Sequence, residues 1–324
     1  MTMGHLDRRT VLAGLSAWAA PAAFAQAGFP SRAVQMIVPA APGGPVSNVA
    51  TLLQPHLARR WRQRVVLQYV PGNGTVTGVL AVARSPATGY HIGLATSALA
   101  INAALRSTMP YRTLDDLVPV SLLASFQYAI FANRREPIHH VGDLLAFARR
   151  RGGAVPYASP GIGTGANIAM EAFAYEAGFR VEHRPYNSTT PAEAAVRAGE
   201  VPLFVGGLTT TVEAAQNGPL QLVALMGGKT AIHADGVSWA SDLVRGFEVT
   251  GHVGAIAPRA VPPAALQVLG ADLAAVAKLP EMRAALTEIG MEPIGFFSPE
   301  SEAHLRADIA RWRLVGRAAR IELN

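Results

Sequence analysis

Three loops combine glycines with hydroxyl and amide side chains, a composition suited to holding an anion without a charged partner. They are Pro42–Asn48, Ser159–Asn167 and Pro185–Pro191, and none contains Lys, Arg, Asp or Glu. Each follows an expected strand and opens an expected helix. Glycine lets the backbone approach a ligand, and the free N–H groups at a helix start favour negative charge. One such loop is usually an ordinary turn, but three together indicate a site for a carboxylate.

Candidate ligand-binding residues come from these loops and from the end of an expected strand at His91–Leu94. Ligands of parallel α/β sheets bind beyond the carboxyl ends of the strands, where all of these residues should lie. The candidates are Gly43, Gly44, Ser47, Asn48, Thr96, Ser97, Gly163, Thr164, Tyr186, Ser188 and Thr189.

The second loop also permits a competing interpretation. Gly161-x-Gly163-x-x-Ala166 follows a strand, opens a helix and precedes Glu182 by the spacing of a dinucleotide fingerprint. An exported nucleotide-dependent oxidoreductase is therefore the alternative function. The motif is weak alone, and Pro160 is unusual within it.

Other signs of catalysis are scarce, so we expect no catalytic residue, metal site or cofactor. The chain has no cysteine, no Gly-x-Ser-x-Gly elbow and no His-Glu-x-x-His motif. His139 and His140 are adjacent and should mark the surface start of a helix. The pair Asp115-Asp116 fits a turn before Leu117. Three further histidines are isolated in the sequence and are interpreted as structural: His91, His183 and His252.

Short β-branched runs alternate with helical patterns, which predicts an α/β fold with parallel sheets. Expected strands are 34–38, 65–68, 91–94, 155–158, 181–184, 201–204 and 222–226, with helices at 47–62, to 83, 142–150, 165–177, 190–198 and 209–217. The C-terminal helix should be capped by Ser298, place Pro299 first and bury Leu305, Ile309 and Trp312.

Two apolar extended segments, Val120–Phe131 and Phe247–Ile256, are candidates for crossings between two lobes. Two crossings make a hinge, and hinge closure can trap a ligand. The expected organisation is a signal peptide at 1–25, one lobe at 26–125 plus 250–324, and a second lobe at 126–249.

The composition and the N-terminal segment indicate which class of protein this is and where in the cell it acts. The chain has 324 residues, 50% of them apolar, and its charge of +6 comes from scattered arginines, so nucleic-acid binding is not expected. Arg8-Arg9, an apolar stretch and Ala23-Phe24-Ala25 form a secretory signal pattern, with a twin-arginine motif as one export route. We expect a periplasmic protein.

Several ordered motifs resemble the tripartite tricarboxylate transporter substrate-binding proteins, the Bug or TctC-like family. They include Ile37–Pro45, Pro71-Gly72-Asn73-Gly74, Ala100–Leu105, Pro119–Leu123 and Gly290-Met291-Glu292-Pro293, and the resemblance runs from about Phe29 to the C-terminus. It implies two Rossmann-like lobes around a cleft, as in type II periplasmic binding proteins. It also implies non-catalytic capture of a small organic acid for membrane transporter subunits, with loop amides on the ligand carboxylate. We expect a monomer.

The chain departs from the family pattern within the loops. The family usually has an aromatic residue at Ala40, Asp at Ser47, Ser at Thr164, His-Leu at Asn167-Ile168 and Lys-Gly at Asn187-Ser188. We infer a roomier pocket without a partner for an ammonium group, suited to a dicarboxylate or aromatic acid. A sensor or moonlighting role is a third hypothesis.

Overall fold

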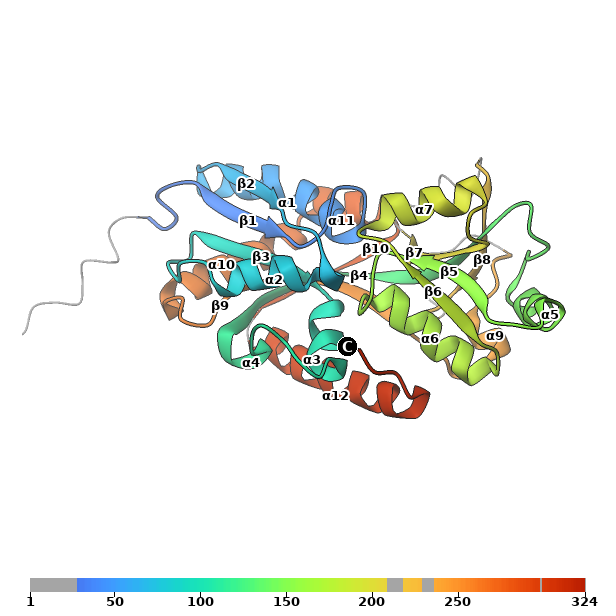
Figure 1. Ribbon diagram of the computed structural model, residues 1–324. Coiled ribbons are helices and arrows are strands. Elements are labelled where there is room, and N and C mark those ends of the chain that lie inside the picture. Colours follow the sequence, from blue (N-terminus) through green and yellow to red (C-terminus); the bar gives the residue numbers. More distant parts are fainter. Residues whose placement is uncertain (1–27, 209–217, 229–235, 298, 324) are drawn as a thin grey trace, which may run out of the picture.

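The computed structural model describes residues 28–208, 218–228, 236–297 and 299–323. Its strands form a mixed sheet in the order β2-β1-β3-β9-β4-β7-β5-β6, with β8 and β10 both paired to β4. Figure 1 shows the helices in two groups, one around each end of the sheet. The predicted α/β class is confirmed. The predicted signal peptide and the helix at 209–217 lie outside the described residues.

The first half is built on three parallel strands, β1 (Val34–Val38), β2 (Val65–Tyr69) and β3 (His91–Thr96). Its helix α1 (Pro45–Trp61) buries Val49, Leu53, Leu57 and Trp61 at four-residue spacing, as the sequence predicts. Its remaining elements are η1 (Asn73–Thr75), α2 (Val76–Ala83), α3 (Ala98–Leu105), α10 (Pro263–Ala277), α11 (Pro280–Glu288) and β10 (Met291–Phe297).

The second half repeats this plan. β5 (Val155–Ser159) pairs in parallel with β6 (Val181–Pro185) and β7 (Leu203–Gly207). The other described elements are β8 (Leu220–Leu225), α5 (Val141–Arg151), α6 (Gly165–Ala177), α7 (Thr189–Ala198) and α9 (Ala240–Leu243). The bounds of α6 match the prediction, because Thr164 caps its start and Gly178 adopts the left-handed conformation at its end.

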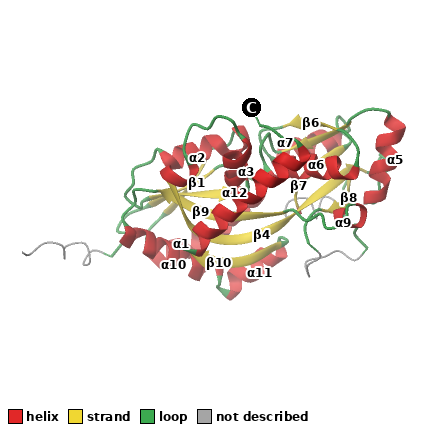
Figure 2. Cartoon of the chain, turned by 90° about the horizontal axis from the view of Figure 1, so that it is seen from below, coloured by secondary structure: helices red, strands yellow, loops and turns green. Residues whose placement is uncertain are grey.

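Two long strands join the halves: β4 (Leu117–Asn133) and β9 (Thr250–Pro258). Residues Leu117–Gln127 of β4 pair with β9, whereas Tyr128–Asn133 pair with β7 and β8 (Figure 2). These pairings are antiparallel, so the expected parallel sheets are found only at the two outer ends. Because the chain crosses from one half to the other in β4 and returns through β9, these two strands run in opposite directions. The change of partner lies beside the predicted boundary at residue 126, and the division into lobes stays a prediction.

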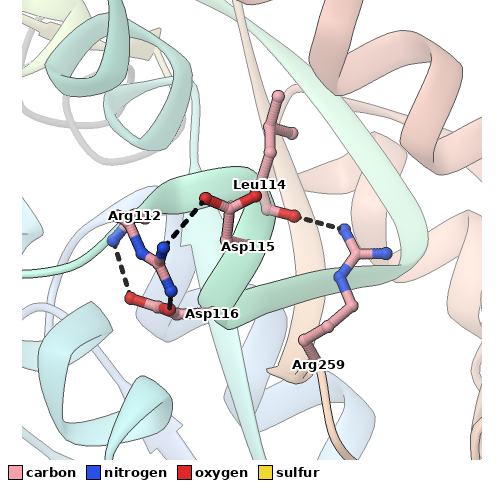
Figure 3. A network of polar contacts seen from close by, with 5 residues as sticks. All are labelled: Arg112, Leu114, Asp115, Asp116 and Arg259. Carbon is pink, nitrogen blue, oxygen red and sulfur yellow. Dashed lines mark hydrogen bonds and ion pairs between the residues drawn. The ribbon is translucent and has the colours of Figure 1, made fainter.

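A polar network fixes the start of β4 against the end of β9 (Figure 3). The guanidinium of Arg259 donates to the carbonyl oxygen of Leu114 over 2.7 Å. Arg112 pairs with Asp115 and Asp116 around α4 (Thr113–Asp116). The backbone N–H of Arg112 also donates to Asp116, which lowers the pKa of that carboxyl. The two aspartates therefore hold a turn before β4, as the sequence indicates.

The C-terminal helix α12 (Glu300–Ala319) packs across β4 and α3 and buries Leu305, Ile309 and Trp312 as predicted. Pro299 occupies the N-cap instead of the first helical position, because the helix begins one residue later than expected. Ser298, its predicted cap, lies outside the described residues. Among the described helices, none has both the length and the apolar character needed to cross a bilayer.

Candidate functional site

A cavity of about 290 Å³ lies between the two halves, at the carboxyl ends of strands from both. None of the described residues that line it is Asp, Glu, Lys, Arg or His. The lining consists of Pro39, Ala40, Ala41, Gly44, Pro45, Val46, Gly72, Asn73, Gly74, Thr75, Thr96, Phe126, Tyr128, Pro160, Gly161, Ile162, Thr164, Gly165, Ala166, Pro185, Tyr186, Asn187, Ser188, Thr189 and Gly207. Its polar groups are therefore backbone amides, hydroxyls and amide side chains.

The structure brings six of the eleven candidate residues to this lining, and all three predicted loops contribute. The six are Gly44, Thr96, Thr164, Tyr186, Ser188 and Thr189. The other five, Gly43, Ser47, Asn48, Ser97 and Gly163, are not part of the lining. Their participation in binding stays a prediction, and their local contacts show what they do in this conformation.

The first loop uses its own amides internally, which corrects the expectation that they are free for an anion. The buried Ser47 Oγ accepts from the N–H groups of Gly43 and Gly44, each over 3.0 Å. It donates in turn to the Gly44 carbonyl over 2.8 Å. The N–H of Asn48 donates to the same carbonyl as part of the first helical turn. Ser47 thus stabilises the loop and is not part of the cavity lining.

The second loop leaves helix-start amides at the cavity. The N–H of Gly163 donates to Asn167 Oδ1 over 3.0 Å, so this amide is already paired. Thr164 Oγ1 accepts from the Asn167 N–H over 3.4 Å. Gly165 and Ala166 form the next two positions, and amides of a first helical turn lack intrahelical acceptors. Both residues line the cavity, so their N–H groups are candidates for an anion.

Glycine is required at 165 because the Tyr128 ring lies against its backbone. A Cβ at that position would overlap the Tyr128 hydroxyl. Tyr128 is itself buried on β4, and burial raises the pKa of its phenol. Ser97 lies behind the cavity wall, where its Oγ accepts from the backbone N–H of His252 over 3.0 Å, while Thr96 lines the cavity.

His183 supports the second loop from beneath, in agreement with its structural interpretation. Its ring stacks on Tyr157 with centroids 4.9 Å apart, and its Nε2 lies 2.7 Å from Ser159 Oγ. Its Nδ1 lies 3.3 Å from Asn167 Nδ2. Burial lowers the pKa of this imidazole to about 4. The neutral ring therefore belongs to the network that shapes the turn.

We predict that His183→Asn reduces the loss of stability in mild acid. A pKa of about 4 in the folded state against 6.5 when unfolded gives stability that is present above pH 6.5 and is lost as pH falls toward 4. At pH 5, protonation of His183 lowers the free energy of unfolding by at most about 2 kcal/mol. Partial exposure of the ring reduces this loss to about 1 kcal/mol. Thermal melts at pH 7 and pH 5 measure it, because the other buried histidines contribute equally to both proteins. Parallel losses in the two proteins contradict the assignment.

The third loop places Ser188 at the N-cap of α7 with no side-chain capping hydrogen bond. Its hydroxyl therefore remains available at the cavity, beside Tyr186 and Asn187. Thr189, the first residue of the helix, is buried and lies close to Gly44 of the opposite half. This loop supplies hydroxyl donors and a second helix start.

Sequence reasoning missed the loop Gly72-Asn73-Gly74-Thr75, although it singled out this stretch as a family motif. Asn73, Gly74 and Thr75 all have positive φ angles, of 49°, 58° and 77°. Such a conformation is strained for a β-branched residue and often marks a functional site. Thr75 Oγ1 is buried without a hydrogen-bond partner among the described residues, so it is a candidate donor to a ligand.

The two halves touch beside the cavity. The Gly74 backbone lies against the carbonyl oxygen of Ile162, and Gly207 lies against Pro45. Asn102 on α3 donates to the Gly74 carbonyl over 3.0 Å, and a Cβ on Gly163 would overlap the Asn102 amide oxygen. Glycines at these points permit an approach that a side chain would block.

The geometry does not favour the dinucleotide interpretation. Glu182 lies near the start of β6, in register with Pro156, and not at the carboxyl end of the strand where a ribose would sit. Its carboxylate is exposed and pairs with Arg184 over 2.7 Å. The Gly163 amide, which should approach a pyrophosphate, is instead paired with Asn167.

Proteins similar to this chain include binding proteins and receptors of a transporter family. A family model described as "Tripartite tricarboxylate transporter family receptor" matches residues 49–318. BugT of Bordetella pertussis is 27% identical over 89% of this chain and 90% of its own. An R. palustris protein solved with adipate is 26% identical with a TM-score of 0.87, covering 91% of this chain and 99% of that one. The periplasmic binding protein BugD shares the fold at 24% identity, with a TM-score of 0.85 over 91% of this chain and 99% of its own.

Proposed function

Because the chain belongs to the tripartite tricarboxylate transporter receptor family, we propose that it captures a small organic carboxylate and delivers it to membrane subunits of such a transporter. The observation that carries this proposal is a cavity between the halves whose described lining has hydroxyls and helix-start amides but no charged side chain. Peptide dipoles at helix starts favour carboxylates without a salt bridge. The volume of about 290 Å³ fits a small ligand.

We propose that the ligand carboxylates meet α6 and α7. One ligand carboxylate accepts hydrogen bonds from the amides of Gly165 and Ala166 and from the hydroxyl of Thr164. A second accepts a hydrogen bond from Ser188 at the start of α7. Thr75, whose hydroxyl has no hydrogen-bond partner within the described part of the chain, donates from the opposite half. Groups from both halves then contact one molecule, so binding favours the closed state.

The cavity suits dicarboxylates or aromatic acids better than amino acids. An ammonium group inside it would meet no carboxylate among the described lining residues, and a buried unpaired charge costs several kcal/mol as a rough estimate. Apolar surfaces from Pro39, Val46 and Phe126 would pack on a hydrocarbon chain or ring. The relative solved with adipate supports this class of ligand.

We also propose that the protein acts in the periplasm as a monomer and without catalysis. The secretory pattern in its first residues and its receptor family support this location. The exported nucleotide-dependent enzyme is disfavoured by the position of Glu182 and by the paired Gly163 amide.

A thermal-shift and calorimetry panel tests the proposed function. At least one of adipate, glutarate, malate, citrate and benzoate should raise the melting temperature in a saturable way. At a ligand concentration of 100 times Kd, binding should increase the free energy of unfolding by about 2.7 kcal/mol. NAD(H) should give no shift. A shift with NAD(H) and none with any acid overturns the proposal.

Within this panel, glutarate and glutamate form a matched pair that differs only by an amine. Glutamate should bind at least 100-fold more weakly, because its ammonium has no partner in the cavity. Equal or tighter binding of glutamate would show that a hydroxyl or carbonyl of the lining accepts the amine, and the inference about ligand class would fail.

A further inference from the structure

A cluster of potential metal ligands lies outside the cavity, where β9 packs against α12. His252 comes from β9, and His304 and Asp308 lie one turn apart on α12. One ligand atom from each lies within 4.8 Å of the other two. Figure 2 shows α12 running across β9 and β4. His252, which stands alone in the sequence, therefore has two potential ligand residues beside it in the fold.

Asp308 carries an unexplained polar atom in this cluster. Its side chain is 10% exposed, and its Oδ2 has no hydrogen-bond partner among the described residues. The nearest base is His252 Nε2 at 3.7 Å, a separation too long for a hydrogen bond. The Trp312 indole N–H lies close to this carboxylate but does not meet hydrogen-bond geometry with it, and among the described residues its Nε1 has no other partner. A buried carboxylate oxygen left in this state is costly unless a cation joins it.

The hydrogen bonds of His252 leave its Nε2 as an acceptor on the side of the ring near Asp308. Its Nδ1 lies 3.2 Å from Ser97 Oγ, and that oxygen also accepts from the His252 backbone N–H over 3.0 Å. With Nδ1–H donating to Ser97, the lone pair on Nε2 faces Asp308. Ligating histidines are commonly fixed in this way through their other ring nitrogen.

We propose that His252, His304 and Asp308 bind a divalent transition-metal ion of the zinc class. Two imidazoles and one carboxylate are a common zinc ligand set, in which water fills the fourth position. Bonds of about 2.0–2.2 Å in a tetrahedral site put ligand atoms roughly 3.3–3.5 Å apart, so the 3.7 Å pair needs little adjustment. His304 is exposed, and its ring already lies edge-on to the His252 ring, with centroids 4.9 Å apart.

A small cavity provides room for the remaining coordination position. It measures about 30 Å³ and is lined by His252, His304 and Ser301 among others. That volume holds a water molecule. A bound ion would link α12 to β9 through its ligands, and β9 is one of the two strands that join the halves. Ser97, which contacts His252, is followed back along the chain by Thr96 in the wall of the ligand cavity.

Zinc titration of the full chain, purified without a histidine tag and stripped with EDTA, tests the site. Calorimetry should give one equivalent with a Kd of about 10 μM or tighter. His304→Ala and Asp308→Asn should each weaken binding at least tenfold. His139→Ala removes an equally exposed histidine on the other half and should leave the affinity unchanged.

Cobalt spectroscopy gives a readout of coordination that does not depend on affinity. Co²⁺ should produce visible absorption bands of a four- or five-coordinate site, and His304→Ala should abolish them. His304 is on the surface, so this variant should keep the melting temperature of the metal-free protein. Zinc binding that is absent, or equal in wild type and both ligand variants, overturns the proposal.

Discussion

Replacing Gly74 by alanine should weaken ligand binding by at least about 100-fold while leaving the ligand-free protein folded. A Cβ at this position would overlap the carbonyl oxygen of Ile162, which belongs to the opposite half. Both groups are backbone, so no side-chain rotation relieves the overlap, and the halves cannot close. The ligand then contacts one set of groups instead of two. Calorimetry with the best acid of the panel measures the loss.

Gly152 provides a matched control for the backbone strain. Its φ of 67° resembles the 58° of Gly74, but a Cβ there meets no atom within 4 Å. Each alanine pays roughly 1 kcal/mol for the left-handed conformation, so both variants should melt slightly below wild type. Only Gly74→Ala should lose affinity. Comparable affinities in the two variants would show that closure at this contact does not contribute to binding.

Local sequence signals predicted the elements that position the site. The helix over 165–177 has Thr164 as its cap and Gly178 at its end, and both act within a few residues. The apolar stripe of α1 likewise depends only on helical periodicity. These signals placed six candidate residues on the cavity, because the carboxyl ends of parallel strands lie at one edge of a sheet.

What the sequence missed depends on contacts between distant segments. Ser47 looked like a ligand donor, yet its hydroxyl reaches back to two amides of its own loop. Composition alone cannot decide between these two partners. The loop at Gly72–Thr75 is held by Asn102, which is distant in sequence. Asp308 and His304 lie at helical spacing, but His252 joins them only through the packing of α12 on β9.

The direction of the pairing in the middle of the sheet was also missed, for a related reason. Alternating strands and helices indicate parallel pairing, and this holds for β1 with β2 and β3. The crossing segments β4 and β9 pair with strands that are distant along the chain, so the rule for consecutive strand–helix–strand units does not govern them. Their apolar, extended character was visible, but their antiparallel pairing follows only from the return of the chain between halves.

Replacing Ser188 by aspartate should separate the electrostatics of the cavity from its fold. Aspartate is a good N-cap, so α7 should be as stable as in wild type or slightly more so. The new carboxylate would occupy a cavity whose described lining has no cation. At roughly 5 Å and an effective dielectric constant of about 20, repulsion of a ligand carboxylate costs about 3 kcal/mol, more than 100-fold in Kd.

Ser188→Asn is the matched control, because asparagine has nearly the same shape and capping strength but no charge. It should bind the acid within about tenfold of wild type. The aspartate variant should recover part of its affinity as pH falls toward the pKa of the new side chain, since protonation removes the repulsion. If aspartate and asparagine weaken binding equally at pH 7, the ligand is not held as an anion near α7. The start of that helix would then serve only to shape the cavity.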